Sequence, residues 1–174
     1  GLLEHGIDTE TEEKTLHAED LKQMWEDELD RIDVEYEVQV RNVSGCFNIP
    51  EEQTVVVAKG SGEERLYSES EARILTMHEL FHVVRAYNGR KAGEKAGLPP
   101  FLGIRTPFYD RTEEGGAVYR EIRTGVITSE KEFDYHLRAV AAYYVAEGLE
   151  FMEAAEKLVD LGGKPERAFE LLAR

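Results

Sequence analysis

Residues 76–85 constrain this chain more than any other stretch, because they contain the motif His78-Glu79-x-x-His82 within a helical pattern. An α-helix advances about 100° per residue, so two residues four apart lie on one face. His78 and His82 can therefore hold one metal ion together. Glu79 points to the neighbouring side, where it can reach a water molecule on that metal. Two neutral imidazoles, a third ligand and a base beside an open position are typical of a zinc hydrolase.

The size and charge of the chain limit what it can be. Its 174 residues fit one domain, and we expect a single zincin-like domain over residues 1–174. Residues 1–15 are expected to be flexible, and the C-terminus looks truncated because the last helical pattern continues to Arg174. With 21 basic and 36 acidic residues the net charge is -15, which argues against binding to nucleic acid or to anionic membranes.

The absence of certain segments predicts a cytoplasmic protein. No apolar run approaches the roughly 20 residues of a membrane span. The first residues have neither the basic region nor the apolar core of a signal peptide. The single cysteine, Cys46, excludes an internal disulfide and fits a reducing compartment.

Hydrophobic periodicity predicts an α+β fold. Apolar residues at helical spacing indicate a helix over 16–32, and alternating or β-branched runs indicate strands over 34–40, 47–50 and 53–58. Ser68 is the predicted N-cap of the metal helix, which Asn88-Gly89 would end. Further helices are expected over 112–123, 128–147, 149–161 and 164–174. This order predicts a zincin-like metallopeptidase with a small antiparallel sheet, an active-site helix and a helical C-terminal part.

The third metal ligand has to come from outside the motif. The other histidines, His5, His17 and His136, show no spacing typical of ligands. A better candidate is the Glu113-Glu114-Gly115-Gly116 stretch, which is similar to the Asn-Glu-Gly stretch that carries the third ligand in aminopeptidase-type zincins. On that pattern Glu114 is the ligand, although Glu113 in its place stays open. The plainer alternative is that both acids only favour a helix N-terminus.

Residue Glu121 adds to this second motif. It lies seven residues after Glu114 and shares its helix face, so it could accept a hydrogen bond from a metal-bound histidine. The two glycines would allow close approach to the metal helix.

These two motifs in combination resemble one known family. Residues 78–89 look like the metal helix of the microtubule-associated tyrosine carboxypeptidase family, a gluzincin type of metallopeptidase, and residues 112–119 resemble its Glu-Glu-Gly-Leu-Ala-Val-Tyr stretch. The resemblance covers residues 49–174. Two departures are that family members usually have one more residue between the histidines, and that Gly116 stands where Leu is usual.

The resemblance implies a zinc-dependent peptide-bond hydrolase. It would be a carboxypeptidase that releases a C-terminal residue, with tyrosine as the candidate, from a peptide or protein. His78, His82 and Glu114 would hold Zn²⁺, and Glu79 would be the general base. The oligomeric state is not indicated by the sequence.

Two further roles need residues beyond the metal motifs. An oxyanion stabiliser could be Tyr119 or Tyr109. The substrate's terminal carboxylate needs a cation, for which Arg85 and Arg105 are the candidates. Packing of the tyrosines and salt bridges of the arginines to neighbouring acids are the plainer explanations.

Three alternatives remain open. An endopeptidase would use the same metal chemistry. A non-catalytic zinc-stabilised protein-binding domain would keep the ligands without a working cleft. A metal-free interaction module would use the acidic surface to bind a basic partner.

Overall fold

The computed structural model describes residues 12–104 and 110–173 of the chain. These residues form two compact units, which lie within Thr9–Ile127 and Thr128–Arg174. The first unit contains every residue of the two motifs. That residues 1–174 act as one domain stays a prediction.

The elements follow the predicted order. The first unit contains α1 (Ala18–Arg31), β1 (Glu37–Arg41), β2 (Phe47–Ile49), the 3₁₀ helix η1 (Pro50–Glu52), β3 (Thr54–Ala58), α2 (Glu69–Ala96), the 3₁₀ helix η2 (Pro100–Gly103) and α3 (Asp110–Thr124). The second contains α4 (Ser129–Ala146), α5 (Phe151–Asp160) and α6 (Pro165–Leu172). The α+β class is therefore confirmed for the described residues. None of their helices combines the length and the apolar character that crossing a membrane requires.

The sheet is mixed, so the prediction of an antiparallel sheet was wrong. Its strand order is β1-β3-β2, with β3 antiparallel to β2 but parallel to β1. All five residues of β3 are buried, so this strand takes the centre, where both faces and both edges are covered. The chain between β1 and β3 is long enough for a crossover, and β2 with the tight turn of η1 lies within it.

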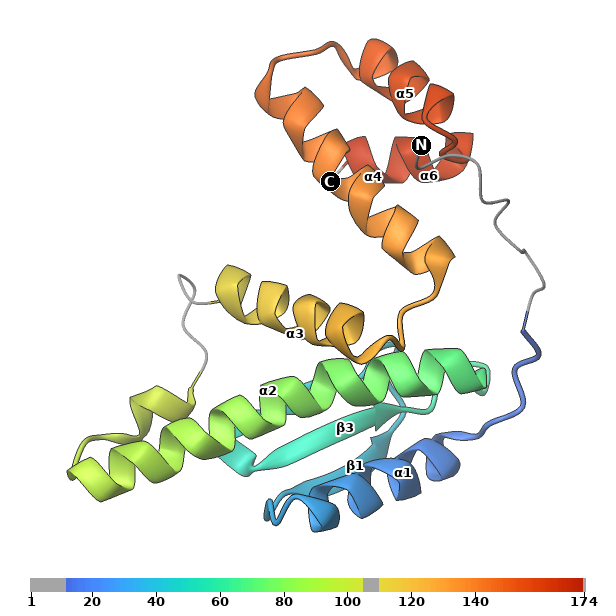
Figure 1. Ribbon diagram of the computed structural model, residues 1–174. Coiled ribbons are helices and arrows are strands. Elements are labelled where there is room, and N and C mark those ends of the chain that lie inside the picture. Colours follow the sequence, from blue (N-terminus) through green and yellow to red (C-terminus); the bar gives the residue numbers. More distant parts are fainter. Residues whose placement is uncertain (1–11, 105–109, 174) are drawn as a thin grey trace. The chain divides into compact units, whose positions relative to one another are not determined.

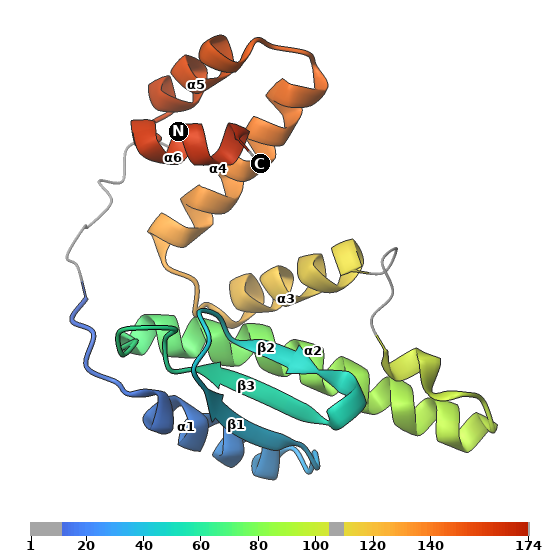
Figure 2. The ribbon, with the colours of Figure 1, turned by 180° about the vertical axis from the view of Figure 1, so that it is seen from behind.

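Helices α1 and α2 cover the same face of the sheet. Figure 1 shows both helices in front of the strands, and Figure 2, seen from behind, shows the strands in front of the helices. The shared core contains Trp25 from α1, Val55 and Val57 from β3, and Val83 from α2, all fully buried. Burial of this apolar surface is the main source of the unit's stability.

A buried polar contact fixes α1 against the start of α2. The indole Nε1 of Trp25 donates to Thr76 Oγ1 at 3.0 Å, and that hydroxyl donates to the Ala72 carbonyl at 2.7 Å. The indole N–H therefore has a partner inside the core, where an unpaired one would be costly. Thr76 lies two residues before His78, so this contact also anchors the metal helix.

Helix α2 runs past Asn88-Gly89, where the sequence pattern predicted its end. Its N-cap is as predicted, since Ser68 Oγ accepts a hydrogen bond from Glu71 N at 3.2 Å. It ends instead at Gly97, whose φ of 65° is left-handed. Gly89 is helical and does not end the helix. A Cβ there would lie 2.0 Å from the Leu102 carbonyl oxygen. Its lack of a side chain lets η2 pack directly on the helix.

The second unit is a small helical unit with its own core. Leu137 and Ala141 of α4 pack with Leu158 of α5 and Ala168 of α6. Helix α6 ends at Leu172, with Ala173 as its C-cap, whereas the sequence pattern predicted a helix that continues beyond it. Arg174 itself lies outside the described residues, as do residues 1–11 of the segment predicted to be flexible.

We predict that Gly89→Ala destabilises the protein, although Gly→Ala inside a helix usually stabilises it by about 1 kcal/mol. The new Cβ would meet the Leu102 carbonyl, so the helix gain should be outweighed by an overpacking cost of about 1–3 kcal/mol. Gly93→Ala is the matched control, because a Cβ there would have its nearest neighbour at 3.5 Å. Urea unfolding curves of both variants measure the difference. A Gly89→Ala protein at least as stable as Gly93→Ala would contradict the close approach.

Candidate metal centre

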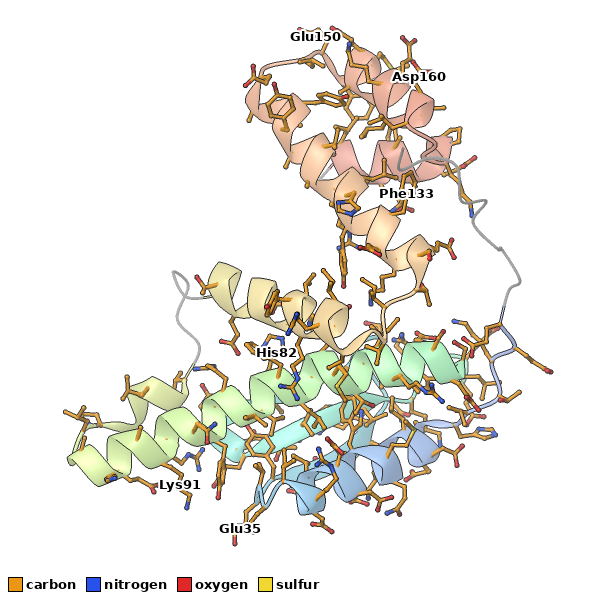
Figure 3. All side chains as sticks on the ribbon, viewed as in Figure 1. Glu35, His82, Lys91, Phe133, Glu150 and Asp160 are labelled. Atoms are coloured by element: carbon orange, nitrogen blue, oxygen red, sulfur yellow. The ribbon has the colours of Figure 1, made fainter. Side chains whose placement is uncertain are left out.

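Three side chains converge between α2 and α3 in the first unit. His78 and His82 lie one turn apart on α2, and Glu114 lies in the first half of α3. Glu114 Oε2 is 3.3 Å from His78 Nε2, and Glu114 Oε1 is 3.6 Å from His82 Nε2. Figure 3 shows His82 on α2 pointing toward α3. The residues predicted as a ligand set are thus brought together across 32 residues of sequence.

The donor set and spacing suit a zinc ion. One ligand atom from each of the three residues lies within 4.8 Å of the others. Tetrahedral bonds of about 2.0–2.1 Å place neighbouring ligand atoms about 3.3 Å apart, close to the two measured distances. Two imidazole nitrogens and one carboxylate oxygen are a usual set for a catalytic zinc site, which keeps its fourth position open.

Each histidine is also held from behind by a carboxylate of α3. His78 Nδ1 lies 2.6 Å from Glu121 Oε1, and His82 Nδ1 lies 2.8 Å from Glu113 Oε1. Both carboxylates are buried, with exposures of 0% and 1%. A carboxylate at Nδ1 favours the tautomer with hydrogen on that nitrogen, which leaves the Nε2 lone pair toward Glu114 for a metal.

The sequence pattern indicated Glu121 in this position but missed Glu113. It treated Glu113 only as a neighbour of Glu114, or as an alternative ligand. The spacing could have predicted this role, because Glu113, Ala117 and Glu121 follow one another at four-residue intervals. They form one helix face, and the structure buries that face.

Small residues let α3 approach the metal helix closely. Ala117 is fully buried. A Cβ on Gly116 would lie 2.5 Å from the Cζ atom of Phe81, the residue before His82. The predicted close approach at the glycines therefore holds for Gly116, and Phe81 fills the space that a side chain would need.

The carboxylates around the site change the pKa of His78. Burial, the largest influence, lowers this pKa, but the hydrogen bond to Glu121 and the charges of Glu79, Glu121 and Glu114 outweigh it and raise the pKa above its usual value. In the metal-free protein the fold therefore favours the protonated ring. A divalent cation would replace that proton and offset the same negative charge.

Glu79 lies on the side of α2 next to the two histidines. Its exposure is 8%, and its charge contributes to the raised pKa of His78. It also contributes, after burial, to the raised pKa of the Cys46 thiol. The carboxylate predicted to be the general base is thus close to the ligand set and largely shielded from bulk water.

Arg85 lies at the site but is engaged by the protein itself. Its Nη2 is 3.0 Å from Glu113 Oε2, and its Nη1 donates to the Leu102 carbonyl at 3.3 Å. Only 15% of the side chain is exposed. This pairing corresponds to the plainer explanation that the sequence had left open.

Among the other predicted site residues, Tyr119 is described by the structure and is not brought to the ligand set. Tyr119 is 62% exposed and lies two residues from both Ala117 and Glu121, which places it on the outer face of α3. Arg105 and Tyr109 lie outside the described residues. Catalytic or substrate-binding roles for these three residues stay predictions.

We predict opposite pH trends for the metal-free and zinc-bound proteins. Because the folded pKa of His78 lies above its unfolded value, its contribution to stability is present below about pH 6.5 and is lost as the pH rises through the folded pKa. Zinc needs the neutral ring, so its affinity should rise by about tenfold per pH unit over the same range.

Calorimetric melting of the metal-free protein and of its His78→Gln variant, from about pH 5.5 to about pH 8.5, isolates the contribution of His78 to the pH dependence of stability. The difference in melting temperature should shrink as the pH rises. A difference that grows would show that the neutral ring is the one favoured by the fold.

Comparison with known proteins agrees with the motifs. The family model of microtubule-associated tyrosine carboxypeptidase matches residues 2–174, a wider span than residues 49–174 over which the motifs suggested a resemblance. The chain has no significant match among curated proteins or among solved structures. With nearly its full length matched, the chain belongs to the microtubule-associated tyrosine carboxypeptidase family.

Proposed function

We propose that this protein is a zinc-dependent carboxypeptidase, with His78, His82 and Glu114 as its metal ligands. The observation that carries the proposal is the convergence of these three side chains within 4.8 Å. It occurs in a chain whose family is that of a carboxypeptidase. A bound zinc ion would lower the pKa of a water molecule to about 7 and polarise the scissile carbonyl.

The protein's own residues would supply the remaining chemistry. Glu79 takes a proton from the attacking water and passes it to the leaving amine. Its shielded position supports this role, because a carboxylate with little bulk water around it interacts strongly with nearby charges. Glu121 and Glu113 keep the two imidazole rings oriented for the metal.

The proposed substrate is the C-terminus of a peptide or protein, with tyrosine as the candidate residue released. The family name supports both points. Arg105 and Tyr109 are proposed to contact the substrate end and Tyr119 to assist catalysis, on the strength of residue chemistry alone. The microtubule association in the family name also supports a cytoplasmic location.

We predict that Glu79→Gln retains zinc but loses most of its peptidase activity. Removing a general base typically costs roughly 10²- to 10⁴-fold in rate, while the amide keeps the size of the side chain and none of the proposed ligands changes. Zinc content by elemental mass spectrometry and kcat on a peptide library are the measurements. Glu94→Gln, an exposed position on the same helix, is the matched control. Wild-type kcat in Glu79→Gln would remove it as the base.

We further predict that cleavage requires a free C-terminal carboxylate. Pairs of peptides that differ only in a free or amidated C-terminus should separate the two classes of peptidase, with product masses read by mass spectrometry. Loss of single C-terminal residues from the free peptide alone is expected, because recognition of the terminal carboxylate defines this class. Internal cleavage of both peptides would instead indicate an endopeptidase.

A further inference from the structure

We infer that Arg85 is a positioning residue for the metal centre, which acts through Glu113 on His82 and does not bind the substrate's terminal carboxylate. This inference rests on the proposed function, since it concerns the same metal ligands. It assigns to Arg85 a different role from the one that residue chemistry alone suggested.

The carboxylate of Glu113 links the two residues directly. One oxygen, Oε1, lies 2.8 Å from His82 Nδ1, and the other, Oε2, lies 3.0 Å from Arg85 Nη2. The side chains of Glu113 and His82 are 0% and 3% exposed. One oxygen thus makes a hydrogen bond with the imidazole, and the other makes an ion pair with the guanidinium.

Burial gives the charge of the arginine a stabilising role in this arrangement. A carboxylate taken out of water is costly unless it is paired and hydrogen-bonded. The imidazole of His82 gives Glu113 a hydrogen bond, whereas Arg85 gives it a permanent opposite charge. Without the guanidinium, the buried carboxylate of Glu113 would lose one opposite charge beside it, and its hold on the His82 ring should weaken.

The other end of the guanidinium is also fixed. Nη1 of Arg85 donates to the Leu102 carbonyl at 3.3 Å. That carbonyl lies very close to α2, as shown by the 2.0 Å that would separate its oxygen from a Cβ on Gly89. Arg85 is therefore oriented from two sides, by α3 and by η2.

Helical spacing places Arg85 correctly for this role. It lies three residues after His82, so both point from the same face of α2 toward α3. The chain of contacts from Leu102 through Arg85 and Glu113 to His82 joins three elements that are separate in the sequence. A substitution of Arg85 should consequently change the affinity for zinc even when no substrate is present.

The test is a double-mutant cycle on zinc affinity, using Arg85→Met, Glu113→Gln and the double variant. Met keeps much of the side-chain length without its charge, and Gln keeps an acceptor for His82 without its charge. Loss of such an outer partner typically lowers metal affinity by roughly 10- to 100-fold. We expect this loss in Arg85→Met. We also expect the double variant to bind zinc as tightly as the single variant with the lower affinity, because both changes break the same chain of contacts.

The measurement is competition of the metal-free full chain with a chromophoric chelator for Zn²⁺. The visible spectrum of the Co²⁺-substituted protein provides a second readout, and it should shift in both single variants. Arg73→Met is the matched control, since Arg73 lies on α2 in an exposed pair with Glu69, and it should leave affinity and spectrum unchanged. Arg85→Lys retains the charge and should recover part of the affinity.

Two outcomes would overturn the inference. One is wild-type zinc affinity in Arg85→Met together with a raised KM for peptides with a free C-terminus only, which would make Arg85 a substrate residue. The other is losses that add in the double variant, which would show that Arg85 does not act through Glu113. A wild-type chain without zinc affinity would instead refute the proposed function, so the two failures are distinguishable.

If Arg85→Met alone does not fold, the comparison moves to Arg85→Lys, which keeps the positive charge, and to the double variant, which removes the charge of Glu113 as well. A double variant with the zinc affinity of the wild type would equally overturn the inference.

Discussion

The pairing of two imidazole rings on α2 with three carboxylates on α3 is the interaction on which the site depends. Glu113 and Glu121 hold the Nδ1 sides of the rings, and Glu114 faces their Nε2 atoms. One short helix therefore supplies both the proposed third ligand and the carboxylates that hydrogen-bond the two histidines. Because few apolar side chains on α3 are buried, these polar contacts carry much of its attachment to α2, and a divalent cation between them would strengthen it.

Helix α2 packs against different neighbours on two of its sides. One side packs on the sheet and α1, where Val83 is fully buried in the core. Another carries His78, His82 and Arg85 toward α3 and η2. The core fixes the helix, and the fixed helix holds the proposed ligands in place, as a scaffold does when it preorganises a site.

Small residues make these contacts possible. Gly89 admits the backbone of η2, and Gly116 admits the ring of Phe81. The second case bears on a departure from the family pattern, since Leu is usual where Gly116 stands. Here Phe81 already fills that space, so a side chain at position 116 would compete with it. A large residue on one helix and a glycine on the other thus form a complementary pair.

The sequence by itself determined most of the local elements and identified the three side chains that the structure brings together. Helical periodicity, the Ser68 cap and the spacing of His78 and His82 are short-range features, and they predicted the metal helix and its histidine face. Glu114 was predicted as the third ligand from the Glu113-Glu114-Gly115-Gly116 stretch, taken together with the His-Glu-x-x-His motif. The prediction of an antiparallel sheet was wrong because strand order depends on which strand is most buried. The prediction that α2 ends at Asn88-Gly89 was wrong because Gly89 allows η2 to pack on the helix.

Only the tertiary structure decided which carboxylate meets which nitrogen. Glu113 and Glu114 are adjacent in sequence and identical in chemistry, but neighbouring residues on a helix point about 100° apart. Once α3 packs on α2, one of them faces His82 Nδ1 and Arg85, while the other faces both Nε2 atoms. The assignment of roles depends on the distance and orientation between two helices, which no local pattern in either helix contains.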